Sequence, residues 1–406
     1  MKILHVNTYD TRGGAARAMY RIHTALSKIG IQSEVLVSEK RSRDNNVHVF
    51  EIPFLKKKKW FIKKIARFRS TKNSSFHSYN IFNSGIDNKI NLFDCDVVHL
   101  HWIGNELISI PEIKKINKPI VWTLHDMWAF SGAEHYDDMN NPGSYRLGYR
   151  KNNANIDAII WKRKARHWKN IKFHFVSISH WIAGCLRESL LFRGYTGSVI
   201  RNCIDTEQYC PRDKYISRKK INIPREKKTV LFGADGKDSN PLKGFRILKD
   251  SFQFLSDSKN DFQFFVFGKG AEQKKEIING VEVIDIGRVN DEDYLTTLYS
   301  AADVFVIPSI IDNYPNTVLE AMSCGTPCVG FKVGGIPELI DHKVNGYLVD
   351  PFDTKGLAEG IAWVLHDKER IDKLGKNARN KIEKECNETL IAEEYKNLYE
   401  SILNNR

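Results

Sequence analysis

The chain has 406 residues, of which 42% are hydrophobic and 27% charged, and its formal net charge is +13. This length and ordinary globular composition predict two domains, each large enough to bury its own core. No apolar run approaches the roughly 18 residues that a membrane-spanning helix needs. Residues 1–7 are too short and too polar for a signal peptide, so we expect a cytoplasmic protein.

The cysteines indicate neither a zinc site nor a disulfide framework. The chain has seven, and the two close pairs, Cys203 with Cys210 and Cys324 with Cys328, lack the Cys-x-x-Cys spacing of zinc ligands. We expect reduced structural thiols, as is usual in the cytoplasm.

A basic segment, residues 56–72, carries much of the excess positive charge. No acidic residue occurs between Glu51 and Asp87, and apolar side chains such as Trp60 and Phe61 lie among the basic ones. The basic residues are Lys56, Lys57, Lys58, Lys59, Lys63, Lys64, Arg67, Arg69 and Lys72. This pattern is typical of a segment that binds an anionic membrane surface. The alternatives are a solvated helix or loop whose charges aid solubility, and a nucleic-acid contact.

The first half of the chain alternates strand and helix patterns. A helix is expected from Ala15 to Gly30, and residues 140–155, rich in Asn, Gly and Tyr, predict a long surface loop. Strands are predicted at residues 3–6, 34–37, 97–100, 119–124 and 173–177. Strands separated by helices predict a parallel sheet.

A second alternating series follows a charged, proline-containing connection at residues 201–225. Helices are expected to begin near Lys243 and Asp291, and residues 353–404 predict three amphipathic helices. Strands are predicted at residues 229–233, 262–268, 281–284 and 303–308. The fold class is therefore α/β, with two successive units.

The strongest functional signal is a strand–loop–helix segment at residues 308–330. A helix that begins near Asn316 would present the backbone N–H groups of Asn316, Thr317 and Val318 as an anion site. Glu320, one turn into that helix, can accept hydrogen bonds from a ribose. The alternative is a capped helix that only packs on the sheet.

The same segment closely resembles the nucleotide-sugar motif of the retaining glycosyltransferases of family four, which have the GT-B fold of two Rossmann-like domains facing a central cleft. The family pattern has two glutamates eight positions apart, and Asp312 and Glu320 stand at those positions. The resemblance implies that Asp312 lies near the transferred sugar and that Glu320 binds the ribose. An aspartate at the first position departs from the family pattern. Residues 312–318 are similar to a branch that makes bacterial surface polysaccharides such as capsule and O-antigen.

The resemblance extends along most of the chain. It implies an acceptor-binding domain at residues 1–203, a nucleotide-sugar-binding domain at residues 204–385, and a C-terminal helix at residues 386–406 that returns to the first domain. Residues 333–338 resemble the family's Gly-Gly-x-x-Glu loop, and residues 345–349 resemble its Asn-Gly-hydrophobic turn.

Basic residues and glycines complete the donor site that the resemblance implies. Lys243, followed by Gly244, matches the family lysine that pairs with the donor diphosphate, and Lys237 is expected as a second cation. A positioned lysine stabilises a leaving diphosphate in the transition state. Gly13 and Gly14 resemble the glycine loop of the first domain, where the backbone approaches the donor phosphate or the acceptor.

His125 ends a predicted strand, at the edge where parallel sheets bind ligands. The resemblance implies that His125 contacts the transferred sugar, and Asp126 would orient it or bind the acceptor. The other residues expected at the acceptor pocket are His101, Trp102 and His135. His99 either lines the same pocket or is a buried strand histidine.

These features lead to the hypothesis of sugar transfer, with retention of configuration, from a nucleoside-diphosphate sugar to a glycan or lipid-linked glycan. We expect no cofactor and no metal ion, because a positioned lysine can stabilise the leaving diphosphate. The resemblance implies that the departing phosphate helps to deprotonate the acceptor, so we assign no protein nucleophile. An anionic membrane surface is a further expected partner, through residues 56–72, at the inner membrane face, and no nucleic acid is expected. Two alternatives stay open: a nucleotide-sugar epimerase on the same fold, and a basic polymer-binding protein with a decayed sugar site.

Overall fold

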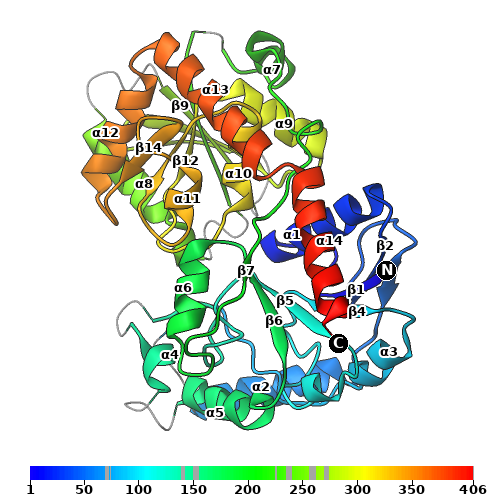
Figure 1. Ribbon diagram of the computed structural model, residues 1–406. Helices are drawn as coiled ribbons and strands as arrows, with labels where there is room; N and C mark the ends of the chain where they lie inside the picture. The colour runs from blue at the N-terminus through cyan, green and yellow to red at the C-terminus, as the bar shows by residue number, and fades with distance from the viewer. Residues whose placement is uncertain are drawn as a thin grey trace. The chain divides into compact units, whose positions relative to one another are not determined.

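The chain forms two seven-stranded sheets, one from each half of the sequence (Figure 1). The computed structural model describes residues 1–68, 73, 75–138, 142–149, 155–224, 226–234, 240–255, 262–268 and 274–405. The strands are β1 Lys2–Val6, β2 Gln32–Val37, β3 Val47–Val49, β4 Val97–Leu100, β5 Ile120–Leu124, β6 Phe173–Ser177, β7 Ser198–Val199, β8 Lys228–Ala234, β9 Phe262–Gly268, β10 Lys274–Ile278, β11 Val281–Gly287, β12 Val304–Ile307, β13 Cys328–Phe331 and β14 Gly346–Val349.

Helices connect most of these strands. The α-helices are α1 Gly14–Lys28, α2 Leu55–Phe68, α3 Ile86–Leu92, α4 Ser144–Leu147, α5 Ile156–Trp168, α6 His180–Glu188, α7 Lys214–Lys220, α8 Phe245–Ser251, α9 Glu292–Ala301, α10 Asn316–Ser323, α11 Ile336–Leu339, α12 Thr354–Leu365, α13 Lys368–Glu385 and α14 Glu388–Asn404. Short 3₁₀ turns are η1 Ile113–Lys115, η3 Pro241–Lys243 and η4 Phe252–Phe254.

The two sheets have the strand order of doubly wound α/β folds. The first runs β3-β2-β1-β4-β5-β6-β7, and all its neighbouring strands are parallel. The second runs β10-β11-β9-β8-β12-β13-β14 and is parallel except for the edge hairpin of β10 and β11. The predicted α/β class and its two Rossmann-like units are confirmed.

The chain divides into two compact units. The first contains Met1–Asn202 and Thr389–Arg406, and the second contains Cys203–Glu388. The C-terminal helix α14 thus lies almost wholly in the first unit, where the Tyr399 hydroxyl lies 2.7 Å from His99 Nδ1.

The first sheet has an apolar face and a polar one. Residues alternate between faces along a strand, and the Leu4, Val6 and Leu100 side chains join the large buried cluster on one face. His5, His99 and Thr123 point to the other face, where α14 contributes Tyr395 and Tyr399. This second face is therefore buried but polar, and it carries titratable side chains.

The second unit is built around an aliphatic and aromatic core. Strand residues such as Phe264 and Val306 pack there with Leu248 of α8 and Ile361 of α12. The helices expected near Asp291 and at residues 353–404 are present as α9 and α12–α14, and Asp291 caps α9 by accepting from the Tyr294 N–H.

The boundary between the two units falls within the connection expected at residues 201–225, but both expected connections contain more structure than a bare loop. Residues 201–225 are no simple linker, because they contain α7, whose Arg218 guanidinium pairs with Asp303 at 2.5 Å. The loop expected at residues 140–155 contains the short helix α4, and Tyr145 and Tyr149 are buried there. Residues 140, 141 and 150–154 of that loop lie outside the described residues.

The basic segment forms helix α2 over most of its length. Trp60 and Phe61 expose 60% and 53% of their surface, so large apolar side chains stand among the lysines in solvent. Arg69 and Lys72 lie outside the described residues. No helix in the described part of the chain is both long enough and apolar enough to span a membrane.

Candidate functional site

The predicted donor site lies at the end of β12 in the second unit. A loop from Pro308 to Pro315 leads into α10, whose N-cap residue, Pro315, makes no side-chain capping hydrogen bond. Asn316 and Thr317 are half-buried there, while Val318 is fully buried. A helix start presents N–H groups and the positive end of the helix dipole, which favour an anion.

Lys243 and Asp312 form an ion pair at this edge of the sheet. The Lys243 ammonium lies 2.7 Å from Asp312 Oδ2, and the Ser309 hydroxyl donates to the same oxygen over 3.4 Å. A backbone hydrogen bond from Ile310 N–H to the Leu242 carbonyl, 2.9 Å, holds the two loops together. The lysine and the carboxylate that the family resemblance singles out are therefore direct partners.

Two glycines make this arrangement sterically possible. Gly244 has φ +69°, and a Cβ there would lie 1.7 Å from the Pro308 carbonyl oxygen. Gly334 has φ +56°, and a Cβ there would lie 1.9 Å from the Asp312 carbonyl oxygen. Both positions combine the left-handed region with a backbone contact, which only glycine tolerates. They hold Lys243 and Asp312 in place.

Glu320 lies deeper in the unit than expected. It is 1% exposed, and Tyr299 of α9 donates its hydroxyl to Glu320 Oε2 over 2.9 Å. Burial and the nearby carboxylate raise the pKa of Tyr299 well above its usual range, so the hydroxyl keeps its proton. The ribose-binding role of Glu320 stays a prediction. Tyr299 was not foreseen, because nothing in the sequence links the two helices.

The structure says less about the remaining predicted donor residues, which are Lys237, Gly13 and Gly14. Lys237 lies outside the described residues. Gly13 has φ +89° and stands at the start of α1, with no atom within 4 Å of a Cβ built there, and the following Gly14 is exposed. The backbone conformation at Gly13 and the open space beside it suit the close approach of a ligand. The roles of Gly13 and Gly14 stay predictions.

In the first unit, the residues predicted for the sugar and the acceptor line one pocket. The pocket has a cavity volume of about 10 Å³, roughly the room that one water molecule needs. The lining residues are His101, Trp102, Ile103, Gly104, Trp122, Thr123, Leu124, His125, Asp126, Trp128, Ala129 and His135. The pocket thus gathers the predicted residues, although it is too small to hold a sugar ring.

Asp126 anchors the polar side of this pocket. It accepts the Trp128 N–H over 2.9 Å and lies 2.6 Å from His135 Nδ1, whose other nitrogen lies 2.8 Å from the Ser78 hydroxyl. Burial opposes the charge of Asp126, but the His135 contact and the Trp128 N–H hold its pKa below the usual value. The Trp102 indole N–H also approaches His135 Nδ1, at 3.1 Å. Since Nδ1 carries one proton at most, the shorter contact favours donation to the Asp126 carboxylate.

His125 is linked to a chain of buried imidazoles. His125 Nε2 lies 3.1 Å from His101 Nδ1, and His101 Nε2 lies 3.0 Å from His5 Nδ1. Burial lowers the pKa of His125 to about 4, with the Asp126 charge opposing the shift. His125 is therefore neutral at pH 7 and offers one donor and one acceptor.

His99 does not line the pocket and is a buried strand histidine, the second of the two alternatives. Its ring is fully buried on the polar face of the first sheet, where Nδ1 lies 2.7 Å from the Tyr399 hydroxyl and Nε2 lies 2.7 Å from Thr123 Oγ1. Sequence reasoning overlooked His5 and Ser78. A histidine inside the apolar run at residues 3–6 was a usable signal for His5, whereas Ser78 carried none.

None of the seven cysteines, all of which lie in the described part of the chain, forms a disulfide bond. Cys324 and Cys328 are buried, and burial raises the pKa of both thiols. They are protonated structural residues.

Comparison with known proteins links these sites to a family. Residues 12–208 match Glycosyltransferase Family 4, and residues 213–381 match Glycosyl transferases group 1. Sucrose-phosphate synthase from Thermosynechococcus elongatus has a similar fold, with a TM-score of 0.70 at 17% identity over 100% of both chains. HepE of Anabaena, in complex with UDP and glucose, has a TM-score of 0.69 at 16% identity over 99% of this chain and 100% of its own.

The relatives found by sequence match over a smaller part of the chain than these solved structures do. N-acetyl-alpha-D-glucosaminyl L-malate synthase of Bacillus anthracis is 27% identical over 213 residues, which are 50% of this chain and 54% of that protein. The matches span only 30% to 54% of the length of the first curated relatives. The two family matches cover consecutive halves of the chain. The first half of the chain is thus similar to the family 4 glycosyltransferases, and the second half to the group 1 glycosyltransferases.

Proposed function

We propose that the chain is a glycosyltransferase that moves a sugar from a nucleoside-diphosphate sugar to an acceptor hydroxyl. The observation that carries this proposal is the Lys243–Asp312 pair beside the start of α10. Negative charge grows on a diphosphate as it leaves, and a fixed ammonium with helix N–H groups stabilises that charge. The two family matches support the same reaction class.

In this proposal Asp312 exchanges partners when the donor binds. Without donor, the Asp312 carboxylate neutralises Lys243. A diphosphate carries more negative charge than one carboxylate and competes for the ammonium. Asp312 can then accept hydrogen bonds from hydroxyls of the donor sugar, the role that the family resemblance implies for this position.

The transfer step needs no protein nucleophile. The bond from the anomeric carbon to the diphosphate oxygen breaks, a bond to the acceptor oxygen forms on the same face, and the acceptor proton passes to the departing phosphate. Configuration is retained. Lys243 supplies the positive charge, so we propose that the step runs without a metal ion. His125, neutral at pH 7, would hydrogen-bond the sugar.

We propose a UDP-sugar as the donor and a glycan or lipid-linked glycan of a bacterial surface polysaccharide as the acceptor. The support for UDP is that HepE, which shares the fold, is described in complex with UDP-glucose. The support for the acceptor is the similarity of residues 312–318 to that branch of the family. The pocket lined by His101, Trp102, Asp126 and His135 is the proposed acceptor contact once it opens.

We also propose that α2 holds the enzyme peripherally at the anionic inner face of the cytoplasmic membrane. Its lysines supply attraction to anionic lipid, worth about 1 kcal/mol each near the surface. Its exposed Trp60 and Phe61 supply apolar area that can enter the interface. A lipid-linked acceptor would be found at the same surface.

The first experiment measures thermal unfolding with UDP, GDP and ADP, each with and without EDTA. A nucleotide present at 100 times its Kd stabilises the fold by about 2.7 kcal/mol, so we expect a clear shift with UDP that EDTA does not alter. Lys243→Ala should lose the shift. Lys355→Ala, which removes an exposed lysine paired with Glu359 on α12, should keep it. If none of the nucleotides shifts unfolding, or if Lys243→Ala responds like the wild type, the proposed donor site is wrong.

A further inference from the structure

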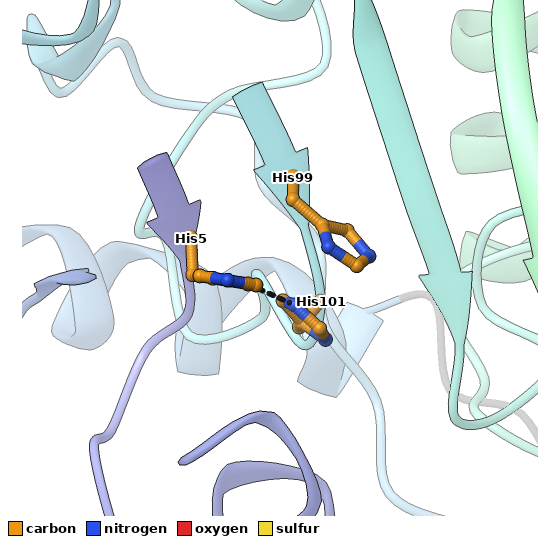
Figure 2. Close-up of side chains that lie close together, drawn as sticks. All are labelled: His5, His99 and His101. Carbon is orange, nitrogen blue, oxygen red and sulfur yellow. Dashed lines mark hydrogen bonds between the residues drawn. The ribbon is translucent and has the colours of Figure 1, made fainter. Parts of the chain in front are cut away.

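Three buried histidines lie together on the polar face of the first sheet (Figure 2). His99 lies on β4 and His101 directly follows the end of that strand, two positions further along, and alternate residues of a strand project to the same face. His5 of β1 stands opposite His99 in the parallel pairing of the two strands. Strand geometry therefore brings the three imidazoles together on one face. One nitrogen from each ring lies within 4.8 Å of the other two.

The surroundings of these rings are closed to solvent. His5 and His99 are 0% exposed and His101 is 3% exposed. Burial lowers the pKa of each ring well below its usual value, with the neighbouring imidazoles adding to the effect. All three are neutral at pH 7, the form in which imidazole binds a metal ion.

His5 provides the observation that points to a ligand. Its Nε2 is buried and has no hydrogen-bond partner within the described part of the chain. A buried polar atom left without a partner costs about 1–3 kcal/mol. A metal ion bound by His5 Nε2 would give this nitrogen the partner that it lacks.

Each ring nitrogen of His99 and His101 has a hydrogen-bond partner, so the ion would replace one partner on each ring and leave the other in place. Histidines that bind a metal ion usually use their second ring nitrogen in a hydrogen bond that fixes the ring. His101 Nδ1 lies 3.1 Å from His125 Nε2. His99 has the hydroxyls of Tyr399 and Thr123, one at each ring nitrogen. Since a hydroxyl can accept or donate, the nitrogen of His99 that keeps its proton has an acceptor, whichever nitrogen binds the ion.

Of the three rings, only that of His101 borders the pocket of the first unit, so a fourth ligand would have to enter from there. The volume of that pocket, about 10 Å³, suits one water molecule. Three histidines and one water are a known ligand set for Zn²⁺, with Zn–N distances of about 2.0–2.1 Å. The three nitrogens lie within 4.8 Å of one another, so the rings would have to move closer together to reach that geometry.

We propose that His5, His99 and His101 form a three-nitrogen site for a divalent transition-metal ion such as Zn²⁺. The site lies within the first unit and is separate from the proposed diphosphate site of the second unit. The ion would tie β1 to β4. With the ion on His101 Nε2, the His101 Nδ1–H donates to His125 Nε2, so His125 carries its own proton on Nδ1.

The test uses the tag-free full chain, stripped with a chelator and dialysed. Zn²⁺ is added and unbound metal removed, and bound zinc is measured by mass spectrometry. Co²⁺ binding is followed by visible absorption. We expect about one equivalent of metal per chain and the intense d–d bands of four-coordinate cobalt. His5→Ala and His101→Gln should each weaken Zn²⁺ binding roughly 100-fold or more, and Tyr399→Phe roughly 10-fold.

His48→Ala is the matched control, because His48 is a partly exposed histidine of β3 that pairs with Glu34. It should bind zinc like the wild type. Circular dichroism checks that each variant is folded, and the cobalt spectrum of the wild type needs no variant at all. If stripped wild type binds less than about a tenth of an equivalent, the three rings form a hydrogen-bonded imidazole chain only and the proposal is overturned. It is also overturned if folded His5→Ala binds as tightly as the wild type.

Discussion

The Lys243 ammonium lies 2.7 Å from the Asp312 carboxylate, although 69 positions separate the two residues in the sequence. Lys243 follows β8 and Asp312 follows β12, and these strands are neighbours in the second sheet. Because neighbouring parallel strands end at the same edge, their following loops meet there. The ion pair is thus a direct consequence of strand order.

Replacing Lys243 by alanine should lower kcat by roughly 10²–10³, the usual effect of removing one preorganised group that stabilises developing negative charge. Steady-state release of UDP from a UDP-sugar donor measures this. Asp312→Asn should keep or tighten UDP binding, because the anion that competes for Lys243 is gone. Equal kcat values for Lys243→Ala and Lys355→Ala would rule out the role of Lys243.

The glycines that shape this loop offer a steric test. Gly334→Ala and Gly244→Ala each place a methyl group within 2 Å of a backbone oxygen and at positive φ, so the loops must move. We expect a loss of stability above about 1 kcal/mol together with weaker UDP binding. Gly184→Ala is the control, because nothing lies within 4 Å of its Cβ and alanine favours helix α6. Chemical denaturation should show Gly184→Ala at or above wild-type stability, and a neutral Gly334→Ala would contradict the described loop.

Tyr299→Phe removes the hydroxyl that donates to Glu320. Because the Glu320 side chain is buried, the lost hydrogen bond should lower the free energy of unfolding by about 1–3 kcal/mol. Urea denaturation measures the difference. Tyr294→Phe removes a hydroxyl from a half-buried position on the same helix and should change stability by less than about 0.5 kcal/mol. If the two substitutions change the free energy of unfolding equally, the Tyr299–Glu320 hydrogen bond does not stabilise the fold as predicted.

Asp126 should make stability depend on pH at the acidic end. Its folded pKa lies below its usual value, so its ionised form stabilises the fold above the unfolded pKa of about 3.9, and this contribution is lost as the pH falls through the folded pKa. Asp126→Asn should therefore cost about 1–3 kcal/mol at pH 7, and the gap to wild type should narrow below about pH 3.9. Asp350→Asn, at an exposed ion pair with Lys332, should cost less than about 1 kcal/mol at any pH. If the stability difference between wild type and Asp126→Asn grows on acidification, the predicted direction of the pH dependence is wrong.

Helix α2 predicts binding to anionic vesicles. Replacing Trp60 and Phe61 by serine should weaken partitioning roughly 10-fold or more at low salt, because each aromatic ring contributes more than about 1.5 kcal/mol when buried. Cosedimentation with vesicles rich in anionic lipid measures this. Leu92→Ser removes another exposed apolar side chain, on α3, and should bind like the wild type. Wild-type protein that stays in the supernatant would end the membrane proposal.

Local patterns predicted most of the elements. The strands at residues 97–100, 173–177 and 262–268 appear as β4, β6 and β9 with the same bounds, because each is a short apolar run bounded by turn residues. The missed elements have weak local signals. Strand β3 has three residues, and β10 is an exposed edge strand rich in charge. Helix α7 was missed because charged and proline residues around it suggested a linker.

Only those candidate site residues that belong to a sequence motif could be predicted. Asp312, Glu320 and Lys243 were identified from the sequence, but not that Lys243 bonds to Asp312 or Glu320 to Tyr299. His5 was passed over, since a single histidine in an apolar strand shows nothing of the histidines on the neighbouring strand.

By itself, the sequence determined the α/β class and the two-unit organisation, and it predicted the residues of the donor motif. These depend on periodicity, turn residues and motifs, all of which act over a few neighbouring residues. Only the tertiary structure decided which of those residues meet. His99 and Tyr399 bond across 300 positions, and His5 faces His99, because strand order and register bring distant segments together. Packing decides such contacts, and no local pattern encodes them.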